Sequence, residues 1–141
     1  MTTRGKYGEM LDPALWVYID RVNDWYPPEI VDLPIDGQRD VYDAMCRAFH
    51  QGIPAGVEVS DILIAASDRS IPVRCYRLAG RGPQATVVYY HGGGFVLGGL
   101  DSHDDICAEL CSATGFAVFS IDFRLAPDHR SDDHTSERRS P

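Results

Sequence analysis

The run Ala85-Thr86-Val87-Val88-Tyr89-Tyr90, followed at once by His91-Gly92-Gly93-Gly94-Phe95, decides the fold of this 141-residue chain. An uninterrupted apolar run is typical of a strand covered on both faces of a parallel sheet. Three adjacent glycines carry no β-carbon, so their backbone N–H groups are left uncovered and positive φ angles are accessible. Such N–H groups can bind the negative charge that develops on a carbonyl oxygen during acyl transfer. We therefore interpret the glycine run as a candidate oxyanion-binding loop.

A helix and a second strand are predicted after this loop. One helical face is formed by Ile106, Cys107, Leu110, Cys111 and Thr114. The spacing predicts a helix that begins near Asp101 or Ser102 and stops at Gly115, a residue suited to a left-handed helix end. The apolar residues 116–121 predict another buried strand. Residues 85–121 are therefore expected to form a βαβ unit with parallel strands.

Before the loop, the pattern predicts two helices and then a hairpin. Asp12-Pro13 supplies an N-cap and a first helical residue for a helix that ends before Pro27. Asp36-Gly37 marks the start of a second helix that continues toward Gly52. Residues 57–66 and 71–78 favour extended structure on either side of a polar turn, which predicts paired antiparallel strands. The fold class is α/β.

Composition limits the classes of partner. The chain is 44% apolar, which is enough for a buried core, and its formal net charge of -8 disfavours nucleic acid and anionic lipid. No apolar run is long enough for a membrane helix, and the first residues do not resemble a signal peptide, so we expect a cytoplasmic protein. The four cysteines, which lack zinc-ribbon spacing, are expected to be buried free thiols and not metal ligands.

Three segments together resemble the hormone-sensitive-lipase-like branch of the α/β-hydrolases, and within it a bacterial acetyl esterase. They are residues 91–98, residues 100–104 and Asp122-Phe123-Arg124-Leu125-Ala126-Pro127-Asp128-His129. The resemblance covers roughly residues 55 to 129. It implies an incomplete α/β-hydrolase sheet, made of an antiparallel hairpin plus a parallel βαβ unit, with N-terminal cap helices.

The resemblance also divides the chain into three parts. Residues 1–54 would be the N-terminal cap helices, and residues 55–128 the N-terminal half of the α/β-hydrolase domain. Residues 129–141 form a tail that is unlike the family and has no aliphatic or aromatic side chain other than histidine, so we expect disorder there. Its abrupt change of composition resembles a shifted reading frame or a premature end.

For the site, the resemblance implies that the N–H groups of Gly92 and Gly93 line an oxyanion hole, that Gly94 lets the loop turn, and that His91 orients it. Enzymes of this fold add a serine in G-x-S-x-G, then an acid, then a histidine. No serine of this chain has glycines two positions before and after it. We therefore expect the triad to lie outside these residues.

The expected activity is serine-dependent hydrolysis of a small short-chain acyl ester through an acyl-enzyme, with no cofactor and no metal. The chain by itself is expected to be inactive. The alternative is a non-catalytic binding module or pseudoenzyme of the same fold. Acyl and alcohol specificity and oligomeric state stay open.

Some single residues allow other interpretations. The spacing of Gly92, Gly94 and Gly98 imitates a dinucleotide-binding loop, but the pattern departs from G-x-G-x-x-G, and Asp101, Asp104 and Asp105 would repel a pyrophosphate. Asp104 and Asp105, together with His103, are explained by a place in the first turn of a helix, where the helix dipole favours negative charge. Asp122 and Arg124 were expected to pair with each other or to brace the loop. The aromatic residues of the first two helices belong either to the core or to an acyl pocket; they are Trp16, Trp25, Tyr26 and Phe49.

Overall fold

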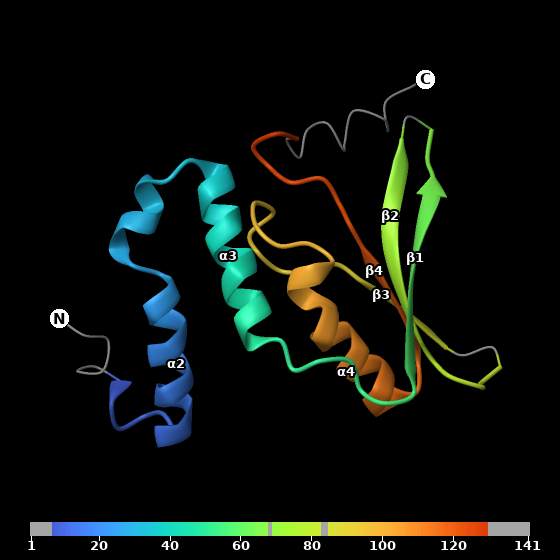
Figure 1. Cartoon of the computed structure of the whole chain (residues 1–141), viewed down its shortest axis with the longest axis horizontal. Coiled ribbons are helices and arrows are strands. Elements are labelled where there is room, and N and C mark those ends of the chain that lie inside the picture. The colour runs from blue at the N-terminus through green and yellow to red at the C-terminus, as the bar shows by residue number, and fades with distance from the viewer. Residues whose placement is uncertain (1–6, 68, 83–84, 130–141) are drawn as a thin grey trace.

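The computed structural model describes residues 7–67, 69–82 and 85–129. Two N-terminal helices stand to one side of a four-stranded sheet, and a further helix lies between them and the sheet in Figure 1. The fold is therefore α/β, as the sequence predicts. The predicted disordered tail, apart from His129, lies outside the described residues.

Helix α2 spans Pro13–Trp25, and its start agrees with the prediction. The Asp12 carboxylate accepts a hydrogen bond of 2.7 Å from the N–H of Ala14, and Pro13 occupies the first turn, where no intrahelical donor is needed. The 3₁₀ helix η1 (Pro28–Asp32) leads to α3 (Ile35–Phe49). Helix α3 starts earlier than predicted, after Pro34, so Asp36 and Gly37 lie inside its first turn.

The sheet has the strand order β1-β2-β4-β3. Strands β1 (Val57–Ala65) and β2 (Ser70–Leu78) form the predicted antiparallel hairpin. Strand β4 (Ala117–Ile121) pairs antiparallel with β2 and parallel with β3 (Thr86–Tyr89). The parallel pair confirms the βαβ unit, and it places the carboxyl ends of β3 and β4 at one edge of the sheet.

The helix of the βαβ unit differs from the prediction at its start. A 3₁₀ turn, η2 (Asp101–His103), precedes α4 (Asp104–Thr114), because the Ser102 hydroxyl bonds the backbone of Gly99 instead of capping the helix. The predicted end is confirmed: Gly115 has φ 71°, and its N–H donates to the Cys111 carbonyl. The buried face also differs, since Ala108 is buried and Ile106 is half exposed.

The hydrophobic core lies between α4 and one face of the sheet. Its fully buried members are Tyr76, Cys107, Ala108, Cys111 and Val118. Strand β3 was predicted to be covered on both faces, and this is wrong for the described residues. Val87 and Tyr89 pack toward the core, whereas Val88 on the opposite face is 55% exposed, because α4 covers one face only.

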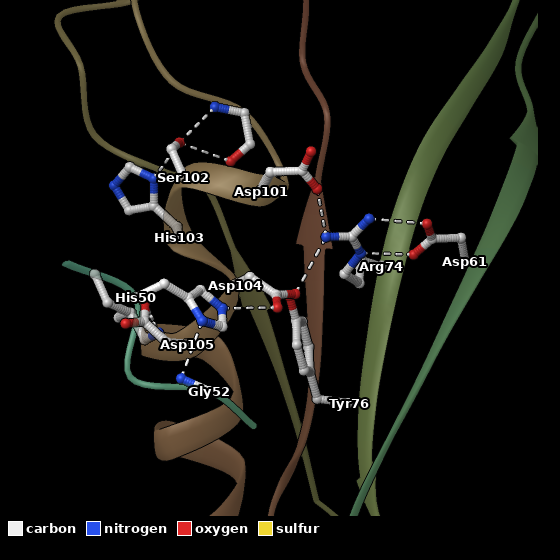
Figure 2. Close-up of polar contacts among 12 residues, drawn as sticks. His50, Gly52, Asp61, Arg74, Tyr76, Asp101, Ser102, His103, Asp104 and Asp105 are labelled. Carbon is white, nitrogen blue, oxygen red and sulfur yellow. Dashed lines mark hydrogen bonds and ion pairs between the residues drawn. The ribbon is translucent and has the colours of Figure 1, made fainter. Parts of the chain in front are cut away.

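A polar cluster fixes α4 to the sheet and to α3 (Figure 2). The Asp104 carboxylate, in the first turn of α4, accepts hydrogen bonds from the Tyr76 hydroxyl at 2.7 Å and from Arg74 at 3.1 Å, both on β2. It also lies 3.2 Å from Nε2 of His50, at the end of α3. Because Nδ1 of His50 accepts from the N–H of Gly52, its proton is on Nε2, which donates to Asp104.

Arg74 extends this cluster. Its guanidinium donates two hydrogen bonds to Asp61 on β1, at 2.8 and 3.0 Å, and one of 2.7 Å to Asp101 in η2. The hydrogen bonds from Arg74 hold the pKa of the Asp61 carboxyl below its usual value. One arginine thereby joins β1, β2, η2 and α4. It fixes the position of the segment that leads from the glycine loop (residues 91–98) into α4.

We expect Tyr76→Phe to lower the free energy of unfolding by about 1–2 kcal/mol, because it removes a donor to a half-buried carboxylate that keeps its other partners. Urea unfolding followed by tryptophan fluorescence measures the change. Tyr18→Phe is the control, since Tyr18 is 53% exposed and should lose less than about 0.5 kcal/mol. Equal losses in the two variants would contradict a structural role for the Asp104 cluster.

Candidate functional site: the glycine loop after β3

The loop that follows β3 has an unusual backbone conformation. The φ angles are 118° at Gly93, 64° at Gly94, 63° at Phe95 and 90° at Gly98. Residues with a side chain rarely adopt positive φ, and glycine does so without steric cost. Among the described residues, Phe95 alone combines a side chain larger than hydrogen with a positive φ. Tertiary contacts around Phe95 must therefore hold its backbone in this conformation.

The loop closes tightly on itself. The N–H groups of Val96 and Leu97 both donate to the Gly93 carbonyl, at 3.1 and 3.0 Å. A β-carbon on Gly93 would overlap the Leu97 carbonyl, and one on Gly98 would lie 2.8 Å from Nδ1 of His91. Glycine is therefore required at both positions for the two ends of the loop to approach each other.

Three consecutive N–H groups of this loop have no acceptor within the part of the chain that the structure describes. Among the described residues, no carbonyl or side chain takes a hydrogen bond from the N–H of Gly92, Gly93 or Gly94. Unpaired backbone donors are uncommon in folded chains unless solvent or a ligand satisfies them. The sequence predicts uncovered amides at these three glycines, and their role in binding an oxyanion stays a prediction.

The buried side chain of His91 packs against the loop and the segment after β4. It is 94% buried, its ring stacks on Phe123 with centroids 4.3 Å apart, and its Nδ1 lies 2.7 Å from the Gly92 carbonyl. The His103 ring lies 5.3 Å away, and burial first, then the nearby His91, lower the pKa of His103. Nε2 of His91 is buried and has no partner among the described residues. The ring thus fills the space between the loop, η2 and the segment after β4.

A cavity of about 580 Å³ adjoins the loop. Its walls come from the end of β3, the glycine loop and the segment after β4, and they include Tyr90, His91, Phe95, Phe123 and Arg124. Most of these side chains are aromatic, and a mostly apolar cavity with a few polar groups is typical of sites for small molecules. The loop therefore borders, through His91 and Phe95, a space of the kind that binds small apolar molecules.

The predicted pairing of Asp122 with Arg124 is absent, since these two described side chains form no ion pair with each other. Nε of Arg124 is buried without a partner among the described residues, and burial raises the pKa of Asp122. Both residues lie in the segment that leaves β4 beside the loop. Whether they brace it stays a prediction.

Several other candidates fall outside this site. Asp104 and Asp105 occupy the first turn of α4, as predicted, and Asp104 belongs to the cluster around Arg74. Trp16 is buried, and Trp25 borders a separate cavity between α2, η1 and α3. The described part of the chain contains no group of three potential metal ligands and no helix long and apolar enough to cross a bilayer.

Sequence reasoning missed Arg39 on α3. Its guanidinium donates to the carbonyl of Val96 in the loop and to the carbonyl of Ala126 after β4. Arg39 shares a helical face with the half-buried Tyr42 and Cys46. The sequence signal was a positively charged residue on the half-buried face of this helix. Helical periodicity does not identify its partners, because Val96 and Ala126 are far from Arg39 in the sequence.

Comparison with known proteins agrees with this architecture. Residues 87–136 match a family described as having the alpha/beta hydrolase fold. The carboxylic ester hydrolase LipN of Mycobacterium tuberculosis is 38% identical over 123 residues, which are 86% of this chain and 32% of LipN. The acetyl esterase of Salmonella paratyphi B is 35% identical over 104 residues, which are 74% of this chain and 32% of that enzyme.

A solved structure shows the same arrangement. The ester hydrolase EH1AB1 from the metagenome of Lake Arreo superposes with a TM-score of 0.73 at 34% identity, over 86% of this chain and 40% of that one. The chain thus spans less than half the length of each relative. The family match, the sequence likeness and the superposition agree on one architecture: the chain has the α/β-hydrolase fold, and it resembles carboxylic ester hydrolases of the hormone-sensitive-lipase-like branch.

Proposed function

We propose that this chain supplies the oxyanion-binding loop of a serine carboxylic-ester hydrolase that acts on small esters with short acyl groups. The observation that carries the proposal is that the N–H groups of Gly92 and Gly93 have no acceptor among the described residues. They belong to a loop whose backbone only glycine accommodates at Gly93, and His91 and Phe95 of the same loop line a mostly apolar cavity. The likeness to ester hydrolases and to an acetyl esterase supports it.

In the proposed reaction, a serine hydroxyl attacks the ester carbonyl, and the carbonyl oxygen gains negative charge in the tetrahedral intermediate. The N–H groups of Gly92 and Gly93 donate to that oxygen. Because the loop fixes both donors in advance, no reorganisation is needed when the charge appears. The alcohol leaves, and water hydrolyses the acyl-enzyme through a second oxyanion in the same hole.

The remaining parts of the chain are assigned roles in the same proposal. Residues 1–54 form a cap over the acyl pocket, residues 55–128 form half of the hydrolase domain, and His91 orients the loop through its contacts with Phe123 and the Gly92 carbonyl. The nucleophile, the acid and the general base are contributed by residues outside these 141. Accordingly, the 141-residue chain alone should not turn over ester.

The first test uses a chimera in which residues 7–129 replace the matching segment of LipN, which supplies the rest of the domain. The chimera should hydrolyse p-nitrophenyl acetate well above a chimera whose serine nucleophile is replaced by alanine. The 141-residue chain alone should match an inert protein of the same concentration. A chimera that melts cooperatively yet has no activity would favour a non-catalytic binding role for this sequence.

The second test compares two glycines in that chimera. Gly93→Ala should lower kcat about 10²–10³-fold, because the new β-carbon overlaps Leu97 and moves the donor out of place. Gly92→Ala should lose much less, since its β-carbon would meet nothing closer than Nε2 of His103 at 3.9 Å. Steady-state kinetics with matched thermal melts separate lost catalysis from lost folding. An unchanged kcat in Gly93→Ala would refute the oxyanion assignment.

A further inference from the structure

We propose that Arg39, on the N-terminal helix α3, is a positioning residue for the oxyanion loop. The inference rests on the function proposed for the glycine loop, because it assigns to Arg39 the task of holding that loop in its donating conformation. It implies that the N-terminal helices act on catalysis through a defined side chain, beyond any role in covering the acyl pocket.

The contacts of Arg39 reach two segments far from it in sequence. Nε donates to the Val96 carbonyl at 3.0 Å, and Nη2 donates to the Ala126 carbonyl at 2.9 Å. Nη1 lies 2.8 Å from the Asp128 carboxylate and 3.2 Å from that of Asp36. The side chain is 21% exposed, so these hydrogen bonds form largely away from bulk water.

The two carbonyl contacts complete a closed ring of interactions around the strained residue. Phe95, with φ 63°, accepts a hydrogen bond of 2.8 Å from the N–H of Ala126. The Ala126 carbonyl accepts from Arg39, and Arg39 donates in turn to Val96, the neighbour of Phe95. The guanidinium therefore holds Phe95 between its neighbour Val96 and its hydrogen-bond partner Ala126. Arg39 reaches both segments from a separate element, helix α3.

The ring is coupled directly to the amides of the proposed oxyanion hole. Val96, whose carbonyl is bound by Arg39, donates its own N–H to the Gly93 carbonyl at 3.1 Å. A shift of Val96 would rotate the peptide groups of Gly93 and Gly94. Small displacements of catalytic groups cost rate steeply, and a misplacement of about 1 Å can cost about 10²-fold.

The geometry requires arginine at this position. A guanidinium presents several N–H donors in a rigid plane, so Nε and Nη2 can bind two carbonyls while Nη1 binds a carboxylate. A lysine ammonium keeps the charge but is a single point and cannot bridge the same acceptors. The carboxylates contribute less, because Asp36 is 86% exposed and Asp128 is 57% exposed, where solvent screens ion pairs.

The experiment compares Arg39→Lys and Arg39→Ala with the matched control Arg47→Lys, which changes an exposed arginine of the same helix. Kinetics are measured on the LipN chimera with p-nitrophenyl acetate. We expect kcat to fall at least tenfold in both Arg39 variants while KM changes less than twofold. Arg47→Lys should leave both constants unchanged, and Asp36→Asn should have a small effect.

Hydrogen exchange with mass spectrometry is measured on the chimera and on the full 141-residue chain. Peptides covering residues 91–98 and 122–129 should exchange faster in Arg39→Lys, while peptides from β1 and β2 should not change. This measurement does not depend on turnover. If the unsubstituted chimera is inactive, the proposed function fails, and exchange alone decides the role of Arg39.

Two results would overturn the inference. In an active chimera, the first is a kcat in Arg39→Lys within twofold of the unsubstituted protein. The second, with or without activity, is unchanged exchange at residues 91–98. A uniform rise of exchange across the sheet would also count against it, since it would show that Arg39 supports global stability and does not position the loop.

Discussion

The carboxylate of Asp104 is the acceptor on which the arrangement of helices and sheet depends. It takes hydrogen bonds from Tyr76 and Arg74 on β2 and from His50 at the end of α3. These hydrogen bonds attach α4 to the sheet and to α3, and removing one donor weakens that attachment. Because α4 follows the glycine loop with only η2 between them, this attachment also fixes where the loop ends.

The loop itself shows why a short glycine-rich segment needs a large scaffold. It combines positive φ angles and tight closure with three N–H groups that have no acceptor among the described residues, a conformation that an isolated chain would not maintain. The stacked pair of His91 and Phe123 supports it from below, and Arg39 ties it to the segment after β4. Side chains from the segments after β3 and β4 and from α3 thus hold the loop in one conformation.

Local chemistry made much of this fold predictable. Asp12-Pro13 identified the start of α2, Gly115 the end of α4, and apolar runs the parallel strands β3 and β4. Prediction failed where a side chain takes an alternative local partner or where groups distant in the sequence decide the outcome. Ser102 bonds Gly99 and delays the start of α4, one face of β3 is left uncovered at Val88, and the partners of Arg39 belong to loops far along the chain. The glycine loop was found because its signal is contiguous.

The burial of the cysteines has a practical consequence for chemical labelling. All four thiols are free; Cys75, Cys107 and Cys111 are buried as predicted, whereas Cys46 is only half-buried. Burial raises the pKa of each thiol, that of Cys107 to about 11. Alkylating reagents attack the thiolate, which such groups rarely form at neutral pH. A single cysteine introduced on an exposed surface should therefore react far ahead of the native four, so a fluorophore or spin label can be attached selectively without first removing them.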